Sequence, residues 1–181
     1  LDGREHLDAG GDPRLLSGEV NAAALDAAAA RAFYMLEHAA TLEVEAAIVN
    51  GVPVATVRVT NQTGHKLPSG YPEGRRMWLN VRGFDAGNAL VYESGAYDAA
   101  TGVLTEDADI RVYEADLGLS PALASSLGLP AGPSFHFVLN DTIIKDNRIP
   151  PRGFTNAGFA SVQAWPVDPG FPGLRYADGQ Y

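Results

Sequence analysis

The stretch TLEVEAAIVNGVPVATVRVT, residues 41–60, decides the fold class. From residue 42 to residue 48 every second side chain is apolar, which is the period of a β-strand with one buried face. Asn50-Gly51 is a dipeptide typical of a two-residue hairpin turn, and the alternation resumes over residues 52–60. The stretch therefore predicts two antiparallel strands joined by a tight turn.

The pattern before this hairpin is helical. Residues 20–40 are rich in Ala and other strong helix formers and contain neither Gly nor Pro, which predicts one long N-terminal α-helix. We expect an apolar stripe of this helix to pack on the rest of the domain, and it consists of Leu25, Ala29, Ala32, Phe33 and Leu36. Residues 1–19 show no period and predict a linker or extended segment.

Short strands follow the hairpin at regular intervals. The sequence predicts them at residues 77–84, 90–94, 110–115, 134–140, 142–145 and 158–164. This spacing favours a mainly β protein, an antiparallel Ig-like β-sandwich with the helix on its side or end. We expect helix and sandwich to form one domain over residues 20–181.

Composition narrows the function classes. The 181 residues carry a formal net charge of −9, which disfavours binding to nucleic acid or to anionic lipid. No apolar run reaches the ~18–20 residues of a membrane span, so we expect no direct membrane span. The chain has no Cys, which excludes a covalently attached haem c or a Cys-ligated metal within it.

The loop 61–76 contains the most distinctive candidate, His65. Gly64 frees the backbone before it and Pro68 stiffens the loop behind it, so the imidazole can be held in one direction. Such an imidazole can ligate a metal or carry a proton, and the alternative is a structural His hydrogen-bonded within the loop. The other three His residues lie far apart in the sequence, without zinc-site spacing.

Arginines and aromatic residues in two long loops predict a surface that contacts a partner. The loops span residues 61–76 and 146–156, and both are longer than simple turns require. Guanidinium groups can pair with a partner's carboxylates, or with acids of the chain itself. The predicted partner-binding residues are Lys66, Tyr71, Arg75, Arg76, Arg148 and Arg152.

Catalytic motifs are absent from the sequence. It contains no GxSxG, no GxxxxGK[ST], no GxGxxG and no Cys nucleophile, so we expect no enzyme activity. Asp98, Asp107 and Asp109 could supply loop oxygens to calcium, although the EF-hand pattern is missing. Otherwise we expect no metal site.

Two motifs resemble one known family. The runs TGHKLPSGYPEGRRMWL and KDNRIPPRGFTN are similar to signatures of a β-sandwich domain in bacterial multihaem c-type cytochromes and cytochrome-associated proteins. In that family haem-binding CxxCH segments usually precede the domain, whereas this sequence has none. The resemblance therefore implies a piece of a longer cytochrome, or a haem-less relative.

The resemblance also implies a function. It implies a periplasmic or extracellular location, an accessory role in electron transport, and a partner that is a multihaem cytochrome or another redox-complex subunit. His65 matches the motif position of a possible axial ligand to a haem c carried by that partner. The alternative from the residues alone is a carbohydrate- or protein-binding adhesion-type sandwich, whose stacking platform would be Tyr71, Trp78, Tyr97 and Trp165.

Overall fold

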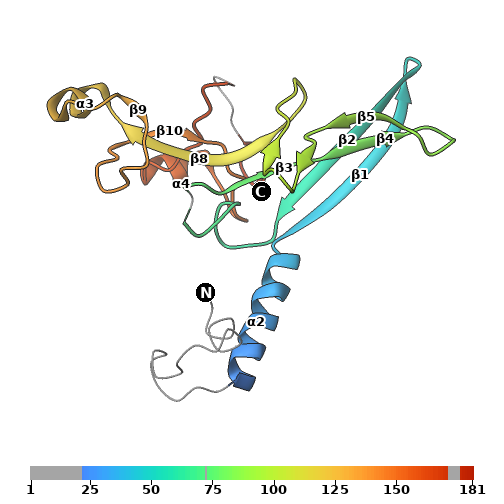
Figure 1. Cartoon of the computed structure of the whole chain (residues 1–181), viewed down its shortest axis with the longest axis horizontal. Coiled ribbons are helices and arrows are strands. Elements are labelled where there is room, and N and C mark those ends of the chain that lie inside the picture. The colour runs from blue at the N-terminus through green and yellow to red at the C-terminus, as the bar shows by residue number, and fades with distance from the viewer. Residues whose placement is uncertain (1–21, 72, 171–175) are drawn as a thin grey trace. The chain divides into compact units, whose positions relative to one another are not determined.

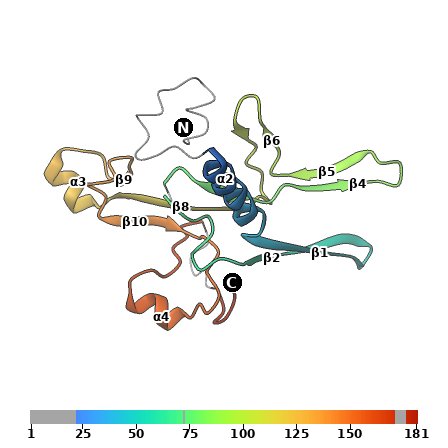
Figure 2. The same ribbon diagram turned by 90° about the horizontal axis from the view of Figure 1, so that it is seen from below.

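The computed structural model describes residues 22–71, 73–170 and 176–181. Its contacts divide the chain into two compact units, Leu1–Gln62 and Thr63–Tyr181. This boundary falls inside the stretch 20–181 that the sequence analysis treated as one domain. The predicted linker at residues 1–19 lies outside the described residues. Figures 1 and 2 show the elements from two directions.

Helix α2, Ala22–Glu37, is the described helix of the first unit and is shorter than predicted. Its Ala-rich sequence explains the helix, but none of its residues is buried. Phe33 and Leu36, from the predicted apolar stripe, are 66% and 72% exposed. At its end the ring of His38 stacks on Tyr34 at 3.9 Å. The stripe therefore does not pack as the sequence analysis expected.

The predicted hairpin is confirmed. Strands β1, Ala40–Val49, and β2, Val52–Asn61, pair antiparallel along their whole length and form the long hairpin in Figure 1. Asn50 and Gly51 both have positive φ, 51° and 81°, as a two-residue turn of type I′ requires. The turn dipeptide thus sets the register, in which Val49 faces Val52.

One face of this hairpin is apolar over four consecutive register pairs of that face, from Leu42 and Val59 to Ile48 and Pro53. Opposed residues share a face, so the register places eight apolar side chains together. We call this set the apolar hairpin face: Leu42, Val44, Ala46, Ile48, Pro53, Ala55, Val57 and Val59. Val44 is 61% exposed and Ile48 is 71% exposed. Among the residues that the structure describes, most of this face is therefore exposed, whereas the alternating pattern predicts that a second layer covers it.

The second unit contains three small antiparallel sheets among its described residues. In the first, β8 pairs with β10, β3 and β9, and Figure 2 shows β8 beside β10. The other two sheets are the hairpins β4–β5 and β6–β7. The bounds are β3 Arg76–Trp78, β4 Val81–Phe84, β5 Leu90–Ser94, β6 Tyr97–Asp98, β7 Val103–Leu104, β8 Val112–Leu119, β9 Gly132–Pro133 and β10 Thr142–Asp146.

The described part of the second unit also contains two helices, and one of them lies where a strand was predicted. Helix α3, Pro121–Leu127, follows β8, and α4, Asn156–Ser161, covers the first half of the stretch 158–164, which ends in a turn. The Thr155 hydroxyl accepts a hydrogen bond from Gly158 N at 3.1 Å and so caps α4. The strand prediction was wrong because a short apolar run cannot distinguish a strand from one helical turn.

The strand predicted at 134–140 is also wrong. This stretch folds into consecutive turns held by its own side chains. The Ser134 hydroxyl accepts from His136 N at 3.0 Å, and Asn140 Nδ2 donates to the Ser134 carbonyl at 2.8 Å. These local bonds compete with a strand ladder.

The strand predicted at 77–84 is divided into β3 and β4. Asn80 lies between them, and its Nδ2 donates to the carbonyls of Ser94 and Gly95 at 3.1 and 3.2 Å. The side chain ties this corner to the end of β5, and β3 and β4 consequently join different sheets.

The described core is small, and three of its seven buried apolar residues come from the two long loops. Its buried apolar residues are Leu67, Leu104, Ala115, Leu119, Ala124, Ile149 and Phe154. Leu67 comes from the loop 61–76, and Ile149 and Phe154 come from the loop 146–156. These loops therefore supply core residues as well as surface.

The fold class is mainly β and antiparallel, as predicted. The more specific arrangement, an Ig-like sandwich, stays a prediction. Within the described ranges, no helix is long and apolar enough to cross a membrane.

Candidate functional site

The two long loops meet through a pair of backbone hydrogen bonds. Leu67 N donates to the Ile149 carbonyl at 2.9 Å, and Ile149 N donates to the Leu67 carbonyl at 2.8 Å. Both residues are buried, so water does not compete with these bonds. This bridge fixes Lys66, which precedes Leu67, beside Arg148, which precedes Ile149.

Asp146 binds both of these cations. Lys66 Nζ donates to its Oδ2 at 2.7 Å, and Arg148 Nε and Nη2 donate to its two oxygens at 2.8 and 2.9 Å. The three side chains retain only 11%, 17% and 6% of their exposure, for Lys66, Arg148 and Asp146 respectively. Burial raises the pKa of Asp146, but the Arg148 and Lys66 bonds outweigh it, so its pKa lies below its ordinary value.

A cavity of about 310 Å³ opens over this cluster. We call it the basic pocket, and it is lined by Gly64, His65, Lys66, Ser69, Gly70, Arg148, Pro151 and Phe159. Lys66 Nζ also donates to the Ala164 carbonyl at 2.8 Å and lies 5.7 Å from the centre of the Phe159 ring. The pocket therefore combines fixed positive charge with apolar walls.

His65 is an exposed residue in the lining of the basic pocket. The Thr63 hydroxyl donates to the His65 carbonyl at 2.9 Å, and His65 N lies 3.3 Å from the same hydroxyl oxygen. This short turn holds the backbone that carries the imidazole.

Asn147 anchors the loop that carries Arg148. Its Nδ2 donates to the Val112 carbonyl at 2.8 Å, and its Oδ1 accepts from Glu114 N at 2.9 Å, so the side chain bonds directly to β8. Tyr176 donates its hydroxyl to the Asn147 carbonyl at 2.8 Å. Burial raises the pKa of Tyr176, which keeps this donor protonated.

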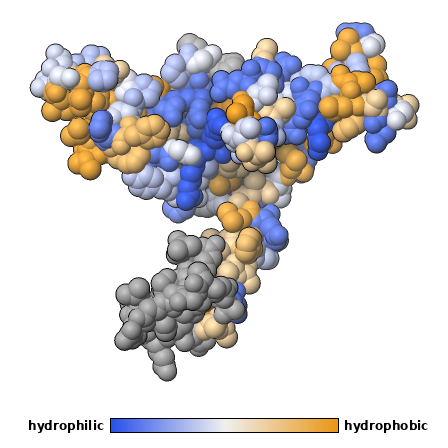
Figure 3. All heavy atoms as spheres, viewed as in Figure 1, coloured by the Kyte–Doolittle hydropathy of each residue, from blue (hydrophilic) through white to orange (hydrophobic). Residues whose placement is uncertain are grey.

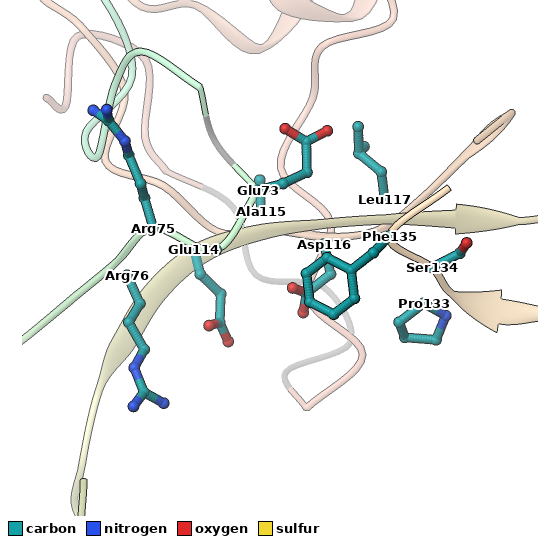
Figure 4. A pocket seen from close by; sticks show the side chains of 11 residues that line it. Glu73, Arg75, Arg76, Glu114, Ala115, Asp116, Leu117, Pro133, Ser134 and Phe135 are labelled. Carbon is teal, nitrogen blue, oxygen red and sulfur yellow. The ribbon is translucent and has the colours of Figure 1, made fainter. Parts of the chain in front are cut away.

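Arg75 and Arg76 lie outside the Asp146 cluster. Figure 4 shows their guanidinium groups pointing in opposite directions, as expected for adjacent residues in extended chain. Arg75 Nη1 donates to the Ser69 carbonyl at 3.1 Å, and the Arg76 guanidinium lies 5.8 Å from the Trp78 ring. Among the described residues neither forms an ion pair.

The remaining predicted partner-binding residues are exposed. Tyr71 is 58% exposed and meets Phe137 edge to face at 5.4 Å. The Arg152 guanidinium lies over the ring of Tyr181 at 5.3 Å. The structure thus brings His65, Lys66 and Arg148 together and leaves Tyr71 and Arg152 out of the basic pocket lining.

A second cavity, of about 390 Å³, lies along β8. Figure 4 shows its carboxylates, Glu73, Glu114 and Asp116, with Phe135 beside Asp116. Lys145 Nζ donates to Glu114 at 2.6 Å. Burial, with the neighbouring charge of Glu114, raises the pKa of Asp116. Mixed charges thus line this cavity, since Arg75 and Arg76 also border it.

The four aromatic residues of the glycan-binding alternative lie in different surroundings. Trp78 meets Tyr97 at 5.1 Å with the rings tilted by 52°, and its Nε1 donates to the Gly95 carbonyl. Tyr71 pairs with Phe137 instead, and Trp165 is 47% exposed. A tilted pair offers no common plane for a sugar ring, and this alternative stays a prediction.

The three aspartates considered as calcium ligands accept hydrogen bonds from nearby groups of the chain. Asp107 accepts from Gly95 N at 2.8 Å and Asp98 from the Thr101 hydroxyl at 2.7 Å, and the pKa of each lies below its ordinary value for that reason. Asp109 accepts from the Tyr92 hydroxyl at 3.0 Å. Over the residues that the structure describes, no three His, Asp or Glu side chains form a group that could hold a metal ion.

Sequence reasoning missed the role of Asp146 as the shared counterion. Asp146 and Lys66 are 80 residues apart, and no local pattern connects them. It also missed Phe159, which it placed in a strand and which instead lines the basic pocket from α4.

Comparisons with known proteins add no relative. No family model, no curated protein and no solved structure matches the chain.

Proposed function

We propose that the chain is a non-catalytic, exported docking module of an electron-transfer assembly whose partner carries the haems. The module fixes subunit geometry and shields the partner's cofactors. The apolar hairpin face is the observation that carries this proposal, because large contiguous apolar surfaces on soluble proteins mark sites of association. The family resemblance of the two loop motifs supplies the identity of the partner class.

The apolar hairpin face also supports the proposed sandwich. A sheet with one apolar face reaches its stable form when a second layer covers it. We assign that second layer to the assembled state. The opposite face, which carries the pair Glu43 and Arg58, remains toward water.

His65 is the residue proposed to reach a haem of the partner. It is exposed and carried on a short turn, so an iron in a docked protein can approach the imidazole. An imidazole nitrogen is a common axial ligand of haem iron, and its field sets the optical and EPR spectra of that haem. Replacing His65 by Met should shift the spectrum of one haem in the native complex, and unchanged spectra at every haem would leave His65 structural.

A pair of hairpin variants tests the docking face. Val44→Lys places a charge on the apolar hairpin face, whereas Thr56→Lys places the same charge one register step away on the opposite face. Both positions are exposed, so both variants should fold. We expect affinity-tagged wild type and Thr56→Lys to retain haem-stained proteins from the exported fraction, and Val44→Lys to lose them.

Two results would contradict the proposal. If the retained proteins contain no haem, the partner class is wrong. If Val44→Lys and Thr56→Lys retain the same haem protein equally, the apolar hairpin face is not the docking surface.

A further inference from the structure

The charges of the Lys66–Asp146–Arg148 cluster do not balance. Two cations share a single carboxylate. Neither cation forms an ion pair with a second carboxylate within the described part of the chain. The lowered pKa of Asp146 keeps it ionised at neutral pH, so the cluster carries a net charge of about +1 in a largely buried place.

The hydrogen-bond donors are also incompletely used. Arg148 presents Nε and Nη2 to Asp146, and its Nη1 has no partner among the residues that are described. A guanidinium has two forked edges, and the Nη1–Nη2 edge remains for another oxyanion. Lys66 Nζ makes two hydrogen bonds and retains a third N–H.

The basic pocket gives these donors a ligand-sized space. Its volume, about 310 Å³, is at the small end of the range of ligand sites. Gly64 and Gly70 keep side chains out of the lining, and Ser69 adds a hydroxyl. Pro151 and Phe159 provide apolar wall beside the cations.

We propose that the basic pocket binds the carboxylate group of a short organic acid. The carboxylate sits on the Nη1–Nη2 edge of Arg148, with Lys66 beside it, and the carbon chain lies against Pro151 and Phe159. One excess positive charge matches a singly charged carboxylate better than a doubly charged phosphate. The inference does not depend on the proposed function, because the site is complete within this chain.

Titration of the purified full chain with sodium propionate tests this site. Binding is followed by the NMR signals of the Arg148 Nε–H and of the amides at 64–70, with sodium chloride holding the ionic strength constant. Propionamide, which has the same shape without the charge, and inorganic phosphate serve as comparison probes. We expect saturable shifts with propionate, at least about tenfold weaker binding of phosphate, and none with propionamide.

Four variants separate the contributions. Arg148→Lys keeps the charge and loses the fork, and Arg148→Gln loses both, so affinity should fall in that order, by at least about tenfold for Arg148→Gln. Gly64→Glu supplies a tethered competing carboxylate, with Gly64→Gln as its matched control. A Cβ at Gly64 meets no atom within 4 Å, so these two variants keep the fold even where the Arg148 variants lose it.

The outcomes decide between the possibilities. Absence of saturable propionate shifts, equal binding of propionamide, or equal affinity of Gly64→Glu and Gly64→Gln would overturn the proposal. Phosphate binding tighter than propionate would overturn the choice of a carboxylate. If propionate also releases the haem-stained partner, the carboxylate belongs to that partner, and if it binds without releasing it, the ligand is a free acid.

Discussion

Asp146 is the residue on which the geometry of both long loops depends. Its oxygens hold Lys66 from one loop and Arg148 from the other, and its backbone bonds Val167 in both directions. Removing one partner from a buried ion cluster leaves a buried charge without its counterion. The stability lost in this way exceeds the net stability that the intact cluster contributes relative to well-packed apolar residues.

Asp146→Asn should therefore destabilise the chain by about 3 kcal/mol, because Lys66 and Arg148 lose their shared counterion while still largely buried. Urea unfolding followed by circular dichroism measures the change. Glu43→Gln is the control, since the Glu43–Arg58 pair is exposed and should contribute less than about 1 kcal/mol. Equal losses in the two variants would show that the cluster has no special role.

The same carboxylate makes stability depend on pH. The pKa of Asp146 is lower in the folded chain than in the unfolded chain. Its contribution is therefore complete above a pH of about 4 and is lost as the pH falls through the lowered folded value. The gap in unfolding free energy between wild type and Asp146→Asn should narrow below pH 4, and a constant gap would contradict this origin.

How far the sequence predicts single residues depends on the range of their contacts. The sequence predicts His65, Lys66 and Arg148 as binding residues because polar and cationic side chains in rigid loops favour binding, and the structure gathers all three around one cavity. Their geometry could not be predicted from the sequence, because it depends on the Lys66–Asp146 ion pair and on the Leu67–Ile149 bridge. Each of these contacts joins residues that are about eighty positions apart.

At the scale of elements, local signals decided what could be predicted. Asn50-Gly51 and the strict alternation around it predicted the hairpin β1–β2. The strand predicted at Leu90–Ser94 has the same bounds in the structure. The strand predictions at 134–140 and 158–164 were wrong because single polar side chains, Ser134 and Thr155, hydrogen-bond to the nearby backbone and redirect it. Apolar content cannot reveal such bonds in advance.

Close packing of β8 against β9 gives an element-scale prediction. A Cβ at Gly118 would overlap the backbone of Gly132, which cannot retreat without breaking the pairing. Gly118→Ala should destabilise the chain by about 2 kcal/mol, measured by thermal unfolding, whereas Gly64→Ala has open space and should change it by less than about 1 kcal/mol. Similar unfolding of the two variants would contradict the close approach.

At the scale of the whole chain, exposed apolar residues outweigh buried ones. Seven apolar residues form the described core, while exposed ones include Phe135 at 83% and Val138 at 98%. Figure 3 also shows hydrophobic surface, in orange, at the end of the molecule where Figure 1 places α3. A chain with this distribution gains stability by association. Alternation in the sequence predicted which hairpin face is apolar, but it cannot supply the layer that covers it.

We propose that a haem-carrying partner supplies the layer that covers the apolar hairpin face. The most direct measurement is the haem content of the native complex, purified through a tag on this chain and assayed by its pyridine haemochrome spectrum. We expect haem c in the complex, in constant proportion to the chain, and none in the chain purified alone. A stable native complex without haem would contradict it.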